Sequence, residues 1–120
     1  MLNNFAINLT RSSDDADRST VAMVVANAAV ASGKNTVIFL SSEGVRLAVK
    51  GVADSIHEEG FQPMATLLQN FLAAGGTIWV CSPCFKKRGF SEGDLIEGAT
   101  IVGGAKFVEF LTNESASISY

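Results

Sequence analysis

The chain has 120 residues, enough for one domain with its own hydrophobic core, and we predict a single domain over residues 1–120. A formal net charge of −3 and a pI near 5.0 argue against direct nucleic-acid binding, which normally requires a basic face. The longest apolar stretch, residues 21–31, falls short of the roughly 20 residues of a membrane span, so we expect no association with a membrane.

Two cysteines lie close together in the sequence, and no charged and then apolar leader precedes them. This pattern is typical of the reducing cytoplasm and excludes a structural disulfide that closes a long loop. Hydrophobic residues make up 48% of the chain and the mean hydropathy is +0.28, which is high for a small protein. We interpret the excess as subunit interface, although the alanines of residues 26–31 also raise the value.

Strand and helix patterns alternate in the first half of the chain. Residues 5–10 alternate in polarity and predict a strand, and Asp14 and Asp15 then supply turn and helix-capping chemistry. The next residues predict a helix that ends at Gly33, with one apolar face formed by Val21, Val24, Val25, Ala28 and Ala29. Residues 36–40 are continuously apolar, as in a strand buried on both faces, and a shorter helical stretch follows and ends near Gly51.

The second half repeats the alternation after a predicted loop at residues 52–60. Pro63 opens a helix that closes at Gly75, and its apolar face consists of Met64, Leu67, Leu68, Phe71 and Leu72. Residues 77–80, 100–102 and 116–120 predict three further strands, with a helix at residues 105–111. Strands that alternate with helices predict an α/β fold with a mostly parallel five-stranded sheet covered on both faces.

The most informative segment is residues 77–84, in which a β-prone run ends at Cys81 and a second cysteine follows at Cys84. Pro83 suits the first turn of a helix, so we expect the cysteines where a strand is followed by a helix. Backbone N–H groups at a helix start favour thiolate, and Lys86 and Arg88 add positive charge. We predict that Cys81 has a depressed pKa and reacts faster than Cys84, with Arg88 and Lys86 stabilising the thiolate or binding an anion.

Three alternative roles for the cysteine pair fit the sequence less well. Two buried cysteines can act as small hydrophobic residues, but a position at the end of a strand makes this a minority interpretation. A thioredoxin requires a cis-proline after the pair, and the only prolines are Pro63 and Pro83. A zinc site needs about four ligands, and beyond the two thiolates the chain offers only His57 and carboxylates, so we predict neither a metal nor a cofactor.

Residues 81–89 resemble the Cys-x-x-Cys-x-x-x-Arg-Gly signature of the DsrE/DsrF-like family, as found in its YchN-type members. The similarity extends over nearly the whole chain through shorter pieces at residues 13–18, 37–40, 43–45, 75–76 and 98–103. The resemblance implies a single-domain, flavodoxin-like three-layer α/β/α sandwich. It also implies a homo-oligomer, with trimers and hexamers as the forms that occur.

The resemblance further implies sulfur chemistry. In the best understood members, a cysteine carries sulfane sulfur as a persulfide between donor and acceptor proteins. That cysteine stands eight positions before the glycine of the Arg-Gly pair, which is the position of Cys81 relative to Gly89. Those members commonly lack the second cysteine, so Cys84 departs from their pattern.

We therefore predict a cytoplasmic sulfur-relay protein, in the class of sulfurtransferases, that carries a persulfide on Cys81. If Cys84 reaches that persulfide, it expels sulfide and closes a disulfide, which would instead give a thiol–disulfide redox or peroxide-reacting protein. A non-catalytic small-ligand or assembly module remains a third alternative. The sequence leaves the sulfur donor, the acceptor and any catalytic turnover open.

Overall fold

A computed structural model describes residues 3–120 of the chain. Its strands are β1 (Asn4–Leu9), β2 (Asn35–Leu40), β3 (Thr77–Cys81), β4 (Ala99–Val102) and β5 (Ser115–Ser119). Its α-helices are α1 (Ala16–Ala31), α2 (Met64–Ala73), α3 (Ser82–Lys87) and α4 (Gly104–Leu111). Short 3-10 helices occur at η1 (Ser13–Asp15), η2 (Ser42–Ala48), η3 (Ala53–Ser55) and η4 (Glu92–Asp94).

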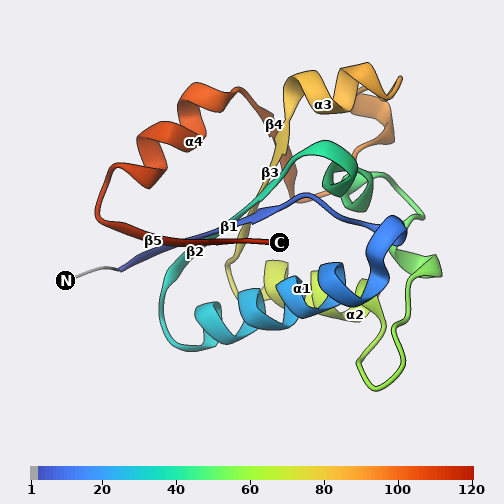
Figure 1. Cartoon of the computed structure of the whole chain (residues 1–120), viewed down its shortest axis with the longest axis horizontal. Helices are drawn as coiled ribbons and strands as arrows, with labels where there is room; N and C mark the ends of the chain where they lie inside the picture. The colour runs from blue at the N-terminus through green and yellow to red at the C-terminus, as the bar shows by residue number, and fades with distance from the viewer. Residues whose placement is uncertain (1–2) are drawn as a thin grey trace.

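The strands form one sheet in the order β4-β3-β2-β1-β5, and every pairing is parallel. Helices α1 and α2 lie on one side of the sheet, and α3 and α4 lie on the other (Figure 1). The predicted three-layer α/β/α sandwich is therefore confirmed, with a sheet that is entirely parallel. Because β5 pairs with β1 and not with β4, the chain crosses the sheet face through α4 before its last strand.

The main core lies between the sheet and the two helices α1 and α2. Two rows of aliphatic side chains cross the sheet in register, Ile7, Ile38 and Ile78 in one and Leu9, Leu40 and Val80 in the other. The predicted apolar face of α2 packs on them, with Phe71 fully buried and Leu72 partly buried. Continuous apolar strands and one striped helix thus form the core that the sequence predicted.

Helix α1 buries a different face from the one predicted. The expected face contains Val24, which is 38% exposed, while the buried residues are Ser19, Thr20, Ala22, Met23 and Ala26. Both faces carry small or apolar side chains, so periodicity alone does not distinguish them. Small residues let α1 approach the sheet closely, and the Asn27 amide donates a hydrogen bond of 3.1 Å to the Leu67 carbonyl of α2.

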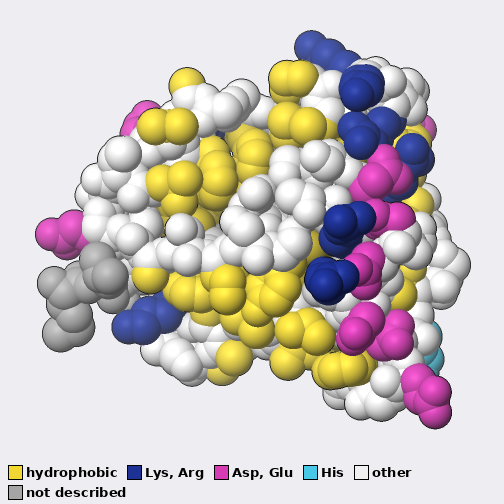
Figure 2. All heavy atoms as spheres, in the orientation of Figure 1, with side chains coloured by type: hydrophobic (Ala, Val, Ile, Leu, Met, Phe, Trp, Pro, Cys, Tyr) yellow, Lys and Arg dark blue, Asp and Glu magenta, His cyan; other side chains and the backbone are white. Residues whose placement is uncertain are grey.

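The opposite side of the sheet carries a second, looser aromatic cluster. Phe107 of α4 stacks on Phe39 at 4.3 Å between ring centroids, and Phe110 meets Trp79 edge to face at 5.7 Å. No α4 residue is buried, and Val108 is 58% exposed. Figure 2 shows hydrophobic side chains gathered in a hollow between α4 and the strands, and a second group over α1.

Smaller differences concern the connections. The helical stretch expected after Ser41 is the 3-10 helix η2, and the segment expected as loop contains the single turn η3. Within residues 3–120 no helix has both the length and the apolar character needed to cross a membrane.

Candidate functional site

Strand β3 and helix α3 place both cysteines at the carboxyl edge of the sheet. Cys81 is the last residue of β3 and also the residue that precedes α3, where Pro83 occupies the first turn. Cys84 lies within α3, and both thiols are free and only partly buried. The structure thus brings the two cysteines together where parallel α/β sheets commonly bind ligands.

The two thiols act on each other's pKa. Burial raises the pKa of Cys81, and the hydrogen bond with Cys84 raises it further because it holds the Cys81 proton. Burial also acts to raise the pKa of Cys84, but hydrogen bonds from the Cys81 thiol and the Ser42 backbone N–H, together with the Arg88 guanidinium, bring it below its ordinary value. When the pair loses a proton, that proton therefore leaves Cys84 before Cys81.

This arrangement corrects the prediction that Cys81 has the depressed pKa. The sequence argument placed the positive influence of the helix start at the first cysteine. In the structure, the groups that stabilise a thiolate converge on the second, and the Ser42 N–H comes from a segment far away in the chain.

An arginine network lies beside Cys84. The Arg88 Nε contacts the Glu43 carboxylate at 2.6 Å, and the Arg88 Nη1 donates to the Cys84 carbonyl oxygen at 3.1 Å. Glu43 also accepts from the Arg46 Nε at 2.7 Å, and the Arg46 guanidinium lies over the Phe90 ring at 5.5 Å. Hydrogen bonds from Arg88 and Arg46 lower the pKa of Glu43. The network joins η2 to α3 across the cysteine pair.

The η2 segment is held in place by its backbone. Ser42 has a φ of 51°, in the left-handed region that non-glycine residues seldom adopt, and this conformation accompanies its N–H contact with Cys84. Gly44 packs so closely on the end of β1 that a Cβ there would lie 2.0 Å from the Leu9 carbonyl oxygen. A fixed η2 keeps the Ser42 N–H directed at the sulfur.

Of the two predicted basic site residues, only Arg88 reaches the cysteines. Its side chain is 16% exposed and its charge acts on both thiols. Lys86 is exposed and lines a separate hollow with Ser82 and Phe90. Sequence reasoning missed Ser42 and Arg46, because only tertiary packing brings η2 beside α3, and nothing in the local pattern marks these residues.

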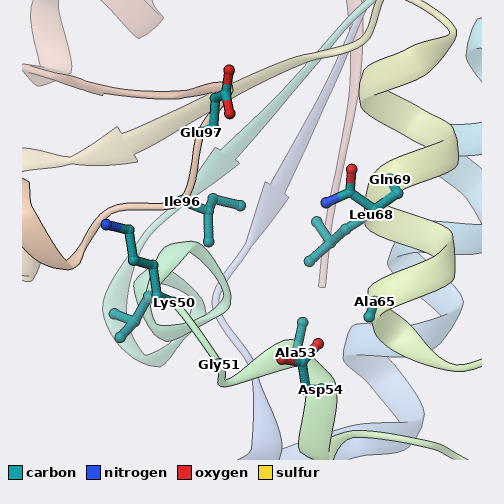
Figure 3. Close-up of a pocket in the computed structure, with 10 residues that line it drawn as sticks. Lys50, Gly51, Ala53, Asp54, Ala65, Leu68, Gln69, Ile96 and Glu97 are labelled. Carbon is teal, nitrogen blue, oxygen red and sulfur yellow. The ribbon is translucent and has the colours of Figure 1, made fainter.

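A cleft of about 250 Å³ lies on the other side of the sheet from α4. Figure 3 shows it between α2 and the segments 50–54 and 96–97, with Leu68, Gln69, Ile96 and Glu97 around it. Its Lys50 ammonium donates to the Gly93 carbonyl at 3.1 Å. Neither cysteine lines this cleft, so it is separate from the thiol site.

Comparisons with known proteins identify a family and several relatives of this chain. The model of the DsrE/DsrF-like family matches residues 3–120. The chain is 31% identical over 108 residues to the uncharacterized protein MJ0760 of Methanocaldococcus jannaschii, covering 90% of this chain and 39% of that protein. It is 29% identical over 116 residues to the uncharacterized protein MJ0989 of the same organism, covering 97% and 98%. The chain thus spans about two-fifths of the first relative and nearly all of the second.

Solved structures share the fold. The ychN protein from E. coli superposes with a TM-score of 0.82 at 19% identity, covering 99% of this chain and 100% of that one. The protein BT1422 from Bacteroides thetaiotaomicron gives a TM-score of 0.70 at 21% identity, covering 98% and 95%. At these sequence identities, the similarity shows a shared arrangement of strands and helices and nothing about function.

Proposed function

The chain belongs to the DsrE/DsrF-like family, and from this premise we propose that it is a sulfur-relay protein that carries sulfane sulfur as a persulfide on Cys81. The observation that carries the proposal is the pair of free, partly buried thiols of Cys81 and Cys84 at the carboxyl edge of the sheet. We further propose that it works in a reducing compartment, because the chemistry requires both thiols in reduced form.

The pair can load sulfur without an external base. In the deprotonated pair, the Cys84 thiolate accepts the Cys81 proton, while the Cys81 sulfur attacks the terminal sulfur of a donor persulfide. The donor S–S bond breaks, the donor leaves as thiolate, and Cys81 becomes a persulfide. Electrons balance, because one S–S bond forms as another breaks.

The opposite pKa directions suit these two roles. A thiolate of higher pKa is intrinsically the stronger nucleophile, provided that something removes its proton. Cys81 has the raised pKa, and Cys84 has the lowered one and a hydrogen bond to the Cys81 thiol. Cys84 thus acts as the proton acceptor that makes Cys81 reactive.

A second candidate function is thiol–disulfide exchange, and the mutual influence of the two thiols favours it. The Cys84 thiolate can attack the Cys81 sulfur of a persulfide, expelling HS⁻ and closing a disulfide. The protein is then oxidised and the sulfane sulfur is reduced to sulfide. Both candidates use the same residues and differ in how long the persulfide survives.

Intact mass after sulfur loading tests the proposal. The reduced protein is mixed with inorganic polysulfide, trapped with a thiol-blocking reagent and weighed. An increase in steps of about 32 Da means bound sulfur, whereas a loss of about 2 Da means a disulfide and supports the redox candidate. No change in mass contradicts both and favours a non-catalytic module.

Serine variants of each cysteine assign the roles. Cys81→Ser should lose all loading, because the acceptor sulfur is gone. Cys84→Ser should still load sulfur and should keep it longer, because it lacks the internal thiol that can discharge the persulfide. Loading that survives in Cys81→Ser and disappears in Cys84→Ser would reverse the assignment.

A further inference from the structure

The outer edge of β5 carries backbone groups that no other strand covers. β5 is the last strand in the sheet order, and within residues 3–120 it pairs with β1 alone. The Tyr120 N–H donates to the Asn8 carbonyl, and the Tyr120 carbonyl accepts from the Thr10 N–H, so both groups point toward β1. These directions alternate along a strand, so the three serines of β5 direct their backbone N–H and C=O groups outward.

The open edge of β5 lacks the features that commonly protect an edge strand. Natural sheets prevent edge-to-edge pairing with lysine, proline, other charges or a bulge. Ser115–Ser119 contains only serine, alanine and isoleucine, and its register with β1 runs without a bulge over all five residues. This edge is therefore open to pairing with a strand of another chain.

Apolar surface borders this edge on the side of α1. Ile118 pairs in register with Ile7, whose row of side chains faces α1, and Ile118 is 41% exposed. A hollow of about 280 Å³ lies nearby on α1 and β1, lined by Phe5, Val25, Ala28, Ala29, Ser32 and Lys34. Figures 1 and 2 look at the sheet from the β5 edge, and Figure 2 shows hydrophobic side chains on both sides of the strand, with most charged ones toward the margins.

The α1 face that the sequence predicted as buried also belongs to this surface. Val24 and Ala28 are exposed, while Val21 and Val25 are only partly buried. The chain thus carries an apolar stripe on α1 that its own core does not use. Apolar surface that a fold leaves uncovered beside an open strand edge is typical of a contact between proteins.

We propose that β5 pairs with β5 of a second copy of this chain, antiparallel across a two-fold axis, with Ser117 opposite the partner's Ser117. In this register Ala116 lies opposite the partner's Ile118, so apolar side chains meet on the α1 side of the sheet and serines meet on the other side. The outward backbone groups of the serines then bond to one another as an antiparallel ladder. A two-fold contact uses the same surface on both copies, as this pairing does.

A second copy suits this surface because the strand pair brings no like charges together. The chain has a net charge of −3, so contact between two acidic faces would be opposed by repulsion. β5 and the exposed stripe of α1 carry no charged side chain, and Lys34 is the one charged residue that lines the hollow. The two α1 stripes lie on the same side of the joined sheet and extend the contact toward the roughly 1,200 Å² of a stable interface. The assembly is then even-numbered, either a dimer or a hexamer built of three such pairs.

Like charges placed on the axis test the contact. Ser117→Lys sets two ammonium groups opposite each other, and light scattering at low micromolar concentration should show about half the mass of the wild type. Thr100→Lys adds the same charge to an exposed position on the other edge strand, β4, and should keep the mass of the wild type. An unchanged mass for Ser117→Lys, or a monomeric wild type, overturns the proposal. Equal dissociation by Thr100→Lys would indicate pairing of β5 with β4 and also overturns it.

Opposite charges should restore the contact, which separates loss of pairing from loss of folding. Ser117→Asp alone should dissociate as Ser117→Lys does, because two carboxylates then face each other. A mixture of the two variants should regain the mass of the wild type, since each pair then joins an ammonium and a carboxylate. A mixture that stays at half the mass contradicts the pairing of Ser117 with its own copy.

Cross-linking tests the register. Cα atoms of a hydrogen-bonded antiparallel pair lie about 5.5 Å apart, within the range of a disulfide. In a Cys81→Ser/Cys84→Ser background, Ser117→Cys should therefore form a covalent dimer with copper phenanthroline as oxidant. Ile118→Cys in the same background should cross-link far more slowly, because its opposite neighbour is the partner's Ala116. Faster cross-linking of Ile118→Cys than of Ser117→Cys overturns this register.

Discussion

At the scale of single residues, Cys81 and Cys84 set each other's pKa. The Cys81 thiol stabilises the Cys84 thiolate by donating a hydrogen bond, and the charge on Cys84 in turn holds the Cys81 proton. The sequence predicted both cysteines as the site, and their place between strand and helix. It could not predict which one holds the charge, because the Ser42 N–H and the orientation of Arg88 depend on packing between distant segments.

Alanine variants should therefore shift the two pKa values in opposite directions. Cys81→Ala removes a hydrogen-bond donor and should raise the pKa of Cys84, so that Cys84 alkylates more slowly at neutral pH. Cys84→Ala removes the partner charge and acceptor and should lower the pKa of Cys81 from its raised value. Alkylation rate against pH, read by mass spectrometry for each single-thiol variant, gives both values, and shifts in the same direction would contradict the coupling.

The Glu43 carboxylate should contribute to stability above its unfolded pKa. Because arginine hydrogen bonds lower its folded pKa, that contribution is present above about pH 4.5 and is lost as the pH falls through the folded value. Glu43→Gln should therefore show a smaller loss of unfolding free energy than the wild type on acidification below about pH 4.5. The difference should stay under about 1 kcal/mol, since the side chain is 36% exposed. Urea unfolding across pH, with Glu97→Gln as control, measures this difference. An equal loss of unfolding free energy on acidification in Glu43→Gln and the wild type would contradict the prediction.

At the scale of elements, the fit of η2 against the end of β1 depends on Gly44. A methyl group at Gly44 would meet the Leu9 carbonyl, whereas one at Gly93 would meet nothing within 4 Å. Gly44→Ala should thus lower the unfolding free energy by about 2 kcal/mol or more, and Gly93→Ala should change it by less than about 0.5 kcal/mol. Gly44→Ala should also raise the pKa of Cys84, because displacement of η2 moves the Ser42 N–H away from the sulfur. Urea unfolding and thiol titration check the two effects, and equal stability of the two variants would be evidence against this packing.

The face that α1 buries can be tested with adjacent residues. Met23→Ala empties a fully buried site and should cost about 2–5 kcal/mol, whereas Val24→Ala, on the partly exposed face, should cost under about 0.5 kcal/mol. Each unfolding curve is repeated over a wide range of protein concentration, because subunit association shifts the midpoint with concentration and packing within the chain does not. A larger loss of unfolding free energy for Val24→Ala than for Met23→Ala at every concentration would support the buried face predicted from sequence.

Secondary structure was predictable where one period dominates. The apolar run of β2 and the single stripe of α2 appear in the structure close to their predicted limits. The face of α1 was not predictable, because its two faces differ little in polarity and the choice depends on which side chains fit against β1 and α2. The type of helix at η2 was not predictable either, and a 3-10 helix replaces the expected helical stretch.

At the scale of the whole molecule, the alternation of strands and helices was enough to predict the sandwich. The strand order could not be predicted from this alternation, since nothing local to residues 115–119 indicates that they pair with β1 and not with β4. The hollow between α4 and the sheet, lined by Trp79, Lys106 and Phe110, follows from that order, because α4 is the connection that crosses the sheet to reach β5. Its residues were therefore outside the reach of motif analysis.

The exposed apolar side chains lead us to expect a stable oligomer, and the family resemblance implies a trimer or a hexamer. Val108 on α4 is 58% exposed and Ile118 on β5 is 41% exposed, and Figure 2 shows hydrophobic surface near both elements. Val108→Lys should dissociate the assembly if α4 forms the subunit contact, and Ile118→Lys should dissociate it if β5 does. Lys87→Ala should leave the assembly intact in either case. Light scattering at low micromolar concentration measures the mass, and a monomeric wild type would contradict the expectation.

The place of β5 beside β1 has a consequence for synthesis on the ribosome. β1 leaves the exit tunnel before the other strands and β5 leaves after them, yet Asn4 pairs with Ser115, and the Thr10 N–H bonds to the Tyr120 carbonyl at 2.9 Å. Until residues 115–120 emerge, nascent β1 presents an open edge of backbone N–H and C=O groups on a growing polysome, where neighbouring chains are concentrated. Chains halted before residue 115 should therefore pair with one another through that edge and depend on chaperones that act during translation.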